Sequence, residues 1–159
     1  KGLVGLAVGR MAGLIAYLSP NLFINKFGRD YVETDGLYEL FGRFEIEKYL
    51  EHNSYSFPKF FDPLSYLYIC KTINIFDAGR NKDKLEDSFL KIEGKLHLIA
   101  FKDDMLFFPN EMEEIRDIMI KIGKKEQVTF KLVDSSSGHD SFLVEVEKFE
   151  EHIKDILKD

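Results

Sequence analysis

The chain has 159 residues, and 45% of them are hydrophobic, including 15 phenylalanines and 7 tyrosines. That apolar content is sufficient for one globular domain with a buried core. The formal net charge of −6 excludes the basic surface that nucleic acids and anionic membranes require, so small molecules or other proteins are the expected partners.

The amino-terminal segment predicts a helix with one broad apolar face, which ends before Pro20. Arg10 is the one charged side chain between Gly2 and Pro20. An arginine at the centre of a bilayer costs about 2.5 to 3.5 kcal/mol, and a signal peptide carries its positive charges ahead of the apolar run, so we expect neither. Because the chain begins with Lys1 rather than Met, we expect an internal piece of a longer protein. The apolar face comprises Leu3, Leu6, Ala7, Met11, Leu14, Ile15 and Leu18.

Two further helices are expected in the first half of the chain, over residues 44–50 and residues 64–76. The second has Asp62 as its N-cap and Pro63 in its first turn, a pattern typical of a helix start. The first half is therefore predicted to be all-helical. Two aromatic-rich segments without strand-like alternation are expected to be connectors, at residues 21–28 and 54–61.

After the polar run of residues 78–87 the pattern changes to strands that alternate with helices. Residues 95–101 form a short apolar run that predicts a buried strand, and residues 127–133 predict a second one. Helices are expected over residues 110–122, with an acidic first turn, and over residues 142–157. Connections of this length join parallel strands, so the second half predicts the edge of an α/β sheet.

Polar side chains follow both predicted strands, at the edge of the sheet where ligands of α/β proteins bind. Asp103 and Asp104 come just after the first strand, and His139 lies in the loop SSSGHDSFL that follows the second. A carboxylate beside an imidazole fixes its tautomer for proton transfer. A lone loop histidine is more often a solvated turn residue, but an acid followed by a histidine is the chain order of the α/β-hydrolases. The pair therefore predicts acid–base catalysis that needs a nucleophile.

The other histidines and the single cysteine predict no metal site. His52, His97, His152 and Cys70 lack the mutual spacing of metal ligands. Cys70 has no second cysteine to pair with and lies in an apolar run, so we expect a reduced, buried thiol and a cytoplasmic protein.

Two stretches of the second half, IAFKDDMLFFP at residues 99–109 and GHDSFL at residues 138–143, resemble the last third of the homoserine O-acetyltransferases. The first half resembles successive blocks of the helical lid of that family, in the same order. The resemblance implies an α/β-hydrolase fold, in which residues 1–87 form the helical lid and residues 88–159 carry the last two strands and helices of the core. The lid blocks are GLAVGRM, AYLS, KFGR, FEIEKYL and FDPLSYLY.

The resemblance implies that Asp104 is the acid and His139 the general base of a Ser-Asp-His triad. The family pattern, in which a bulky residue and then Leu-Phe follow the acid, selects Asp104 over Asp103. Lys102, Asp103 and Met105 depart from that pattern, which more often has small polar residues and an aromatic there. A G-x-S-x-G-like turn after a strand is absent from the sequence, so the resemblance places the serine upstream of Lys1. The isolated chain is therefore expected to be inactive.

Arg10 is an unusual charge for an apolar helix, and the residues alone leave two explanations open. Its guanidinium can extend along its stem to the surface, or it can bind a carboxylate through two parallel hydrogen bonds. The resemblance implies the second role, with homoserine as the ligand, and implies that Asp140 binds the amine of the same substrate. Asp140 is also a candidate N-cap for the last helix.

The resemblance implies an acyltransferase that moves acetyl from acetyl-CoA to the hydroxyl of L-homoserine through an acyl-serine intermediate, in methionine biosynthesis. It implies acetyl-CoA as the acyl donor, no permanently bound cofactor, and a homodimer through the lid helices. Alternatives on the same fold are a succinyl donor, serine as the acceptor, or a hydrolase. The alternative from another class is a noncatalytic helical module for dimerisation or binding.

Overall fold

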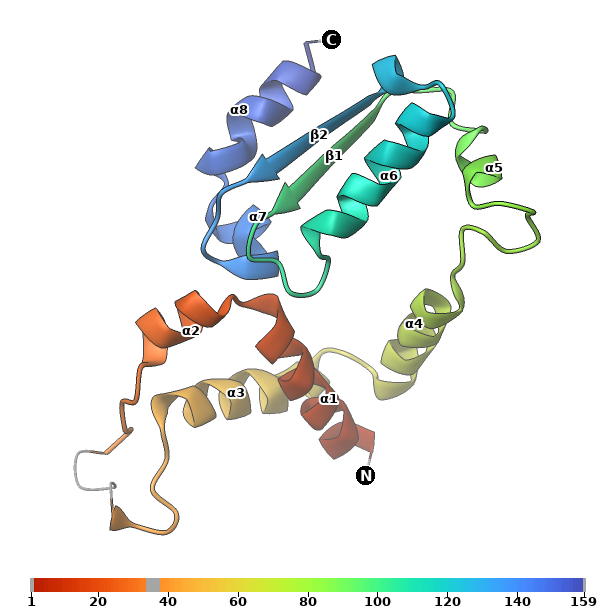
Figure 1. Cartoon of the computed structure of the whole chain (residues 1–159). Coiled ribbons are helices and arrows are strands. Elements are labelled where there is room, and N and C mark those ends of the chain that lie inside the picture. Colours follow the sequence, from red (N-terminus) through yellow and green to blue (C-terminus); the bar gives the residue numbers. More distant parts are fainter. Residues whose placement is uncertain (1, 34–37, 159) are drawn as a thin grey trace. The chain divides into compact units, whose positions relative to one another are not determined.

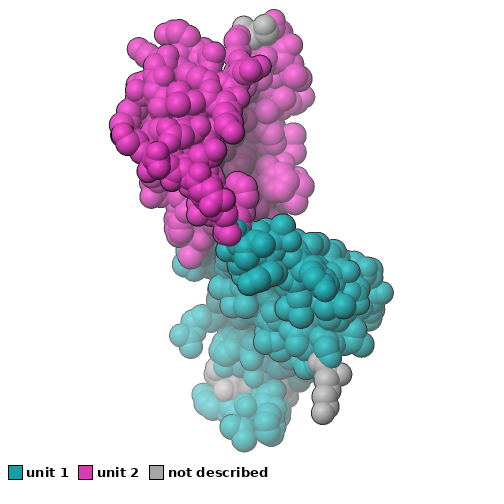
Figure 2. Space-filling model, turned by 90° about the vertical axis from the view of Figure 1, so that its right-hand side faces the viewer, with its two compact units in different colours: residues 1–75 teal, residues 76–159 magenta. Residues whose placement is uncertain are grey.

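The structure is a computed structural model that describes residues 2–33 and 38–158 (Figure 1). The chain forms two compact units, residues 1–75 and residues 76–159 (Figure 2). The first unit is helical, and the second contains the two strands together with further helices. The division into a lid of residues 1–87 and a core portion of residues 88–159 stays a prediction.

The first unit is built from four α-helices in its described part. Helix α1 packs against α3 and α4, and α2 contacts α3. The buried hydrophobic side chains of this unit are Leu6, Ala7, Leu14, Leu18 and Phe27. The helices span Gly2–Tyr17 (α1), Pro20–Phe27 (α2), Glu45–Ser56 (α3) and Pro63–Ile75 (α4), and a short 3-10 turn covers Phe57–Lys59.

Helix α2 lies where the sequence predicted a connector, so that prediction was wrong. The Ser19 hydroxyl accepts a hydrogen bond from the Leu22 N–H at 3.0 Å, and Pro20 occupies the first turn of the helix. Gly28, with φ of 50°, ends it. Pro20 therefore both ends one helix and begins the next, because its fixed φ and missing N–H suit a first helical turn.

The other helix starts of the first unit agree with the sequence better than the helix ends do. The Asp62 carboxylate accepts a hydrogen bond from the Ser65 N–H at 2.7 Å, which confirms Asp62 as the N-cap of α4. That bond lowers the pKa of Asp62. Helix α3 continues to Ser56, beyond the predicted end at residue 50 and into the second predicted connector.

The second unit has the predicted order of strand, helix, strand and helix. The last predicted helix, over residues 142–157, is two helices with a break at Glu145, and the short helix α5 before β1 was not predicted. The elements are Glu86–Phe89 (α5), Leu96–Phe101 (β1), Pro109–Lys121 (α6), Val128–Val133 (β2), Ser141–Val144 (α7) and Glu147–Ile156 (α8), with 3-10 turns at Lys125–Gln127 and Gly138–Asp140.

Strands β1 and β2 pair in parallel, as predicted, and they end at the same level. The register pairs Leu96 with Val128 at one end and Phe101 with Val133 at the other. The Lys102 N–H donates to the Val133 carbonyl at 3.0 Å, which extends the ladder by one residue. Helix α6 lies along the two strands (Figure 1). The core of this unit consists of Leu98, Ala100, Phe101, Ile118, Met119 and Val133.

The sequence predicted that the first helix does not span a membrane and that Cys70 is buried. Within residues 2–33 and 38–158, no single helix is long and apolar enough to cross a bilayer, while α1 and α2 together have the length and composition but are bent by 102°. Cys70 is a free thiol that is half-buried, rather than buried as predicted.

Candidate active site

The loops that follow the two strands bring Asp104 and His139 together. Asp104 lies three residues after β1, and His139 lies in the Gly138–Asp140 turn after β2. The Asp104 Oδ2 is 3.0 Å from the His139 Nδ1, a hydrogen-bond distance. Asp104 is only 6% exposed and the His139 side chain 23%, so this contact is largely shielded from water. The two strands therefore deliver both groups to one edge of the sheet.

The Asp104 carboxylate is held in place by the turn that follows β1. Its Oδ1 accepts hydrogen bonds from the Leu106 N–H at 2.8 Å and the Phe107 N–H at 2.9 Å. Short local bonds of this kind are typical of aspartate in turns. One carboxylate oxygen is thus fixed by its own turn, while the other contacts the imidazole. Asp104, the acid that the family pattern selects over Asp103, makes this contact.

The imidazole of His139 lies edge-on to two aromatic rings. The ring centroids of Phe107 and Phe142 are 5.2 Å and 5.7 Å from its own, with interplanar angles of 61° and 71°. A carboxylate can only accept a hydrogen bond, so Nδ1 carries the proton and the neutral ring has its lone pair on Nε2. This is the tautomer that a general base needs.

The histidine loop is a tight turn whose shape depends on a glycine. Gly138 has a φ of 69°, in the left-handed region that residues with a Cβ adopt only at a cost. The Ser141 hydroxyl donates to the Gly138 carbonyl at 2.6 Å, and Ser141 is fully buried. His139 therefore sits between a glycine turn and a buried serine that closes it.

Asp140 directly follows the histidine and is half-buried. It stands at the N-cap position of α7, but in the part of the chain that the structure describes its side chain makes no capping hydrogen bond there. Asp140 thus occupies an N-cap position, as the sequence predicted, but without the side-chain bond that usually accompanies it. The Asp140 carboxylate is therefore not occupied by the N–H groups of α7, all of which the structure describes.

Glu145 is a residue of this site that the sequence did not single out. It is 8% exposed, and its Oε1 accepts a hydrogen bond from the Ser136 N–H at 3.1 Å. Its other oxygen forms an ion pair with Lys148. Burial raises the pKa of the Glu145 carboxyl, but hydrogen bonds from Lys148, Ser137 and Ser136 outweigh it and lower the pKa to about 2. The carboxylate is therefore ionised in the folded protein at neutral pH.

A signal for Glu145 was nonetheless present in the sequence. In the predicted helix of residues 142–157 the apolar face passes through Phe142, Val146 and Phe149. Glu145 lies beside that face at helical spacing, where a carboxylate is costly unless it is paired. An acid at such a position indicates either a pairing cation or a break in the helix. The structure has both, because Glu145 pairs with the exposed Lys148 and the helix breaks at Glu145.

Arg10 belongs to the first unit, where its guanidinium lies over two aromatic rings. It is 4.9 Å from the ring centroid of Tyr17 and 5.0 Å from that of Phe57. Arg10 is half-buried, so these contacts hold a partly desolvated cation. Asp140 belongs to the second unit.

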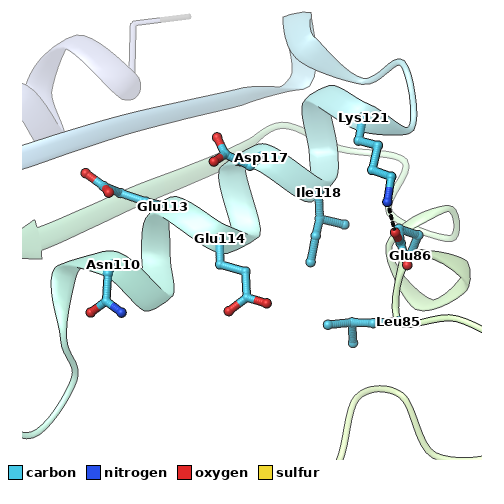
Figure 3. Close-up of a pocket in the computed structure, with 8 residues that line it drawn as sticks. All are labelled: Leu85, Glu86, Asn110, Glu113, Glu114, Asp117, Ile118 and Lys121. Atoms are coloured by element: carbon cyan, nitrogen blue, oxygen red, sulfur yellow. Dashed lines mark hydrogen bonds and ion pairs between the residues drawn. The ribbon is translucent and has the colours of Figure 1, made fainter.

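A pocket of about 500 Å³ lies between α5 and α6 in the second unit (Figure 3). Its carboxylates outnumber its one cation, Lys121, which is paired with Glu86 at 2.6 Å. A negatively charged lining repels phosphate groups, so this pocket does not suit a coenzyme A tail. Within residues 2–33 and 38–158, no group of three or more His, Cys, Asp or Glu is arranged to hold a metal ion. The pocket is lined by Leu85, Glu86, Asn110, Glu113, Glu114, Asp117, Ile118 and Lys121.

Comparison with known proteins identifies relatives at high sequence identity. No family model matches the chain. It is 56% identical over 158 residues to the homoserine O-acetyltransferase of Nautilia profundicola, a match that covers 99% of this chain and 42% of that protein. It is 54% identical over 157 residues to the homoserine O-acetyltransferase of Sulfurimonas autotrophica, with the same coverage. The chain thus spans 42% of the length of these curated relatives.

Solved structures of low sequence identity share the fold. The crystal structure of homoserine O-acetyltransferase from Bacillus anthracis superposes with a TM-score of 0.87 at 18% identity, over 99% of this chain and 42% of that one. Esterase E22 superposes with a TM-score of 0.81 at 23% identity, over 98% of this chain and 42% of that one. The chain is therefore part of an α/β-hydrolase fold, as the sequence predicted.

Proposed function

We propose that this chain, which is homologous over 99% of its length to the carboxyl-terminal part of the homoserine O-acetyltransferases, supplies the acid and the base for acetyl transfer from acetyl-CoA to L-homoserine. The observation that carries the proposal is the 3.0 Å contact between Asp104 Oδ2 and His139 Nδ1. This contact aligns the imidazole and leaves Nε2 as the proton acceptor. The nucleophilic serine comes from the remainder of the enzyme.

In the first half-reaction, His139 Nε2 takes the proton of the serine hydroxyl while the serine oxygen attacks the thioester carbonyl of acetyl-CoA. The carbon–sulfur bond breaks, and the coenzyme A thiolate takes the proton from the imidazolium. An acetyl-serine ester remains on the enzyme. Asp104 stabilises the imidazolium in this step and keeps its ring oriented.

In the second half-reaction, the same nitrogen takes the proton of the homoserine hydroxyl, and that oxygen attacks the acetyl-serine ester. O-acetylhomoserine forms, and the serine oxygen recovers its proton from His139. Water would attack the ester in the same way, so the site must exclude it. The low exposure of Asp104 and the two phenylalanine rings around His139 support a shielded site.

Arg10 and Asp140 are our candidates for binding the zwitterionic end of homoserine. A guanidinium that contacts two aromatic rings is a pre-oriented donor for the substrate carboxylate. A half-buried carboxylate next to the base can accept the substrate amine. A pair of opposite charges favours an amino acid over a neutral alcohol as the acceptor.

We also propose that residues 1–87 are the lid and residues 88–159 the carboxyl-terminal part of the core, and that the lid helices form a homodimer. Helix α4 supports the dimer, because none of its residues is buried although most are apolar. Covering such a face with a second copy removes apolar surface from water. The exposed apolar residues of α4 are Leu64, Leu67, Tyr68, Ile69, Ile73 and Ile75.

The remaining proposals concern cofactors and location. The triad chemistry runs on side chains and the donor thioester, so the proposed enzyme needs acetyl-CoA as a substrate and no resident cofactor. The reduced Cys70 supports a cytoplasmic protein. The net charge of −6 supports partners other than nucleic acid or a membrane surface.

A hydrolase is the second candidate, because esterase E22 shares the fold at a TM-score of 0.81. In that case water replaces homoserine in the second half-reaction, with the same roles for Asp104 and His139. A succinyl donor or a serine acceptor would also use the same two residues. A noncatalytic dimerisation module is the outcome if the pair does no chemistry.

The test is an assay of the complete protein that contains this chain. Acetyl-CoA and succinyl-CoA are each offered with homoserine, with serine and with no acceptor, and free coenzyme A thiol is followed together with acetate. We expect acetyl transfer to homoserine, and a loss of about 10³- to 10⁴-fold in the variant His139→Ala. The control is His97→Ala, whose imidazole bonds to Thr129 near the opposite end of the two strands. It should retain the wild-type rate.

Three results would contradict the proposal in different ways. Acetate release without homoserine assigns a hydrolase. An unchanged rate in His139→Ala supports the noncatalytic module. Acetyl transfer by the isolated 159-residue chain removes the need for a serine from elsewhere in the enzyme.

A further inference from the structure

We propose that Glu145 is a positioning residue, which holds the loop carrying His139 so that the imidazole meets Asp104. This inference rests on the proposed acetyl transfer. The carboxylate reaches back nine residues along the chain to the Ser136 N–H, at 3.1 Å. It also accepts a hydrogen bond from the Ser137 side chain. Glu145 thus joins the end of the loop to its beginning, with His139 between the two.

Two further bonds are donated by residues on the carboxyl-terminal side of His139. The Ser141 hydroxyl donates to the Gly138 carbonyl, and the Glu145 N–H donates to the Ser141 carbonyl at 2.8 Å. Glu145 is therefore linked to both flanks of His139, through its side chain on one flank and through its backbone on the other. A displacement of Glu145 moves both flanks of the histidine.

Glu145 is also the residue at which the chain stops being helical. Its φ of −120° and ψ of 43° separate α7 from α8. An unbroken helix over residues 142–157 would direct this side chain along the helix surface. The break is what allows the carboxylate to point at residues 136 and 137. The local sequence favours an unbroken helix here. We therefore infer that the contacts with the loop compensate for the break.

The competing explanation is that Glu145 only stabilises the start of α8, because acids near a helix amino terminus interact favourably with its dipole. The contacts favour the loop. It is the backbone carbonyl of Glu145 that accepts the Lys148 N–H at 3.0 Å, while the carboxylate contacts Ser136, Ser137 and the Lys148 ammonium. The side chain is thus occupied with the loop and one neighbouring cation rather than with the α8 backbone.

The variant Glu145→Gln tests this role in the complete enzyme. It keeps the size of the side chain but removes the charge that attracts three donors. We expect kcat to fall by about 10- to 100-fold, with little change in KM for either substrate. A displacement of a catalytic group by about 1 Å is sufficient for a loss of this size. A purely structural role would lower the amount of folded enzyme and leave kcat per active site unchanged.

A second measurement needs neither substrate. A fluorophosphonate probe forms a phosphorus–oxygen bond with the nucleophilic serine and releases fluoride, while His139 takes the serine proton. We expect its labelling rate, measured on folded enzyme, to fall in Glu145→Gln by the same factor as kcat. Two controls should label near the wild-type rate: Glu147→Gln, an exposed acid two residues away, and Lys148→Met, which removes the ion pair and keeps both loop donors.

The outcomes separate this inference from the proposed function. Wild-type labelling together with normal labelling of Glu145→Gln overturns the positioning role and leaves acetyl transfer standing. A wild-type enzyme that neither labels nor transfers acetyl overturns both. If Glu145→Gln does not fold, Ser137→Ala removes one donor to the carboxylate, and it must slow labelling for the inference to hold.

Discussion

The two loops of the candidate site differ in what holds them. The Asp104 turn is self-contained, since the carboxylate accepts hydrogen bonds from N–H groups two and three residues further along the chain. The His139 loop is closed by Glu145, which comes from the break between two helices. An acid can thus be positioned by local bonds alone. The base depends on a residue outside its own turn.

This difference predicts where the site is sensitive to substitution. In the Asp104 turn, a single side chain performs both tasks, because one oxygen shapes the turn and the other contacts the imidazole. In the histidine loop the tasks are divided among Gly138, Ser141 and Glu145. Substitutions in the first loop should therefore be severe at one position, and those in the second should be graded.

The largest effect is expected from Asp104→Asn. Asparagine keeps an oxygen for the Leu106 and Phe107 N–H groups, so the turn survives, but its NH₂ faces Nδ1 and favours the wrong tautomer. We expect kcat of the complete enzyme to fall by about 10⁴-fold, the loss that a wrong tautomer causes in a serine triad. The control Asp103→Asn should keep its activity. A comparable loss in that control would transfer the acid role to Asp103.

An intermediate effect is expected from Gly138→Ala. Gly138 and Gly123 both have positive φ, at 69° and 81°, so alanine should cost about 1 to 2 kcal/mol of unfolding free energy at either position. Gly123 follows α6 and lies outside both loops of the site. Urea unfolding should thus report similar losses, while kcat falls by about 10-fold or more only in Gly138→Ala. Equal kcat values in the two variants would contradict the graded sensitivity of the loop.

The last effect is the pH dependence that the charge of Glu145 gives to stability, and this dependence should be smallest near neutral pH. The pKa of Glu145 is lowered from 4.5 to about 2 in the folded protein, so the stability it contributes is complete above pH 4.5 and is lost as the pH falls through about 2. Its size is at most about 3.5 kcal/mol, because a shift of one pKa unit corresponds to about 1.4 kcal/mol.

Urea unfolding of the wild type and Glu145→Gln at pH 6 and pH 3 measures this contribution. The stability difference between them should be smaller at pH 3, and neither protein should change between pH 6 and pH 8 on account of this group. A difference that is the same at both acid and neutral pH would assign the effect to packing rather than charge.

The sequence predicted the second unit more closely than the first. Short runs rich in apolar and β-branched residues locate β1 and β2 to within one residue. Helix α2 was not predicted because a proline is compatible both with the end of one helix and with the first turn of the next. Apolar periodicity does not distinguish these two roles of Pro20, whereas a serine directly before a proline indicates an N-cap and a helix start.

The site could be predicted only in part. Parallel strands bring Asp104 and His139 to one edge, and that follows from chain order. The role of Glu145 could not follow from order, because residues 142–157 have helical periodicity throughout and the break at Glu145 is decided by hydrogen bonds to residues 136 and 137. The aromatic contacts of Arg10 likewise join α1 to the 3-10 turn after α3, a pairing set by tertiary packing.

The shared level at which β1 and β2 end has a consequence for how such chains can vary. Phe101 and Val133 form the last pair of the ladder, so the loops that carry the acid and the base begin at the same level of the sheet. One residue inserted in either strand would advance its loop by about 3.3 Å and turn alternate side chains to the opposite face. Strand length is therefore as constrained as the identity of the two titratable groups. The connection between α6 and β2 lies at the far end of the ladder, where insertions leave that count unchanged.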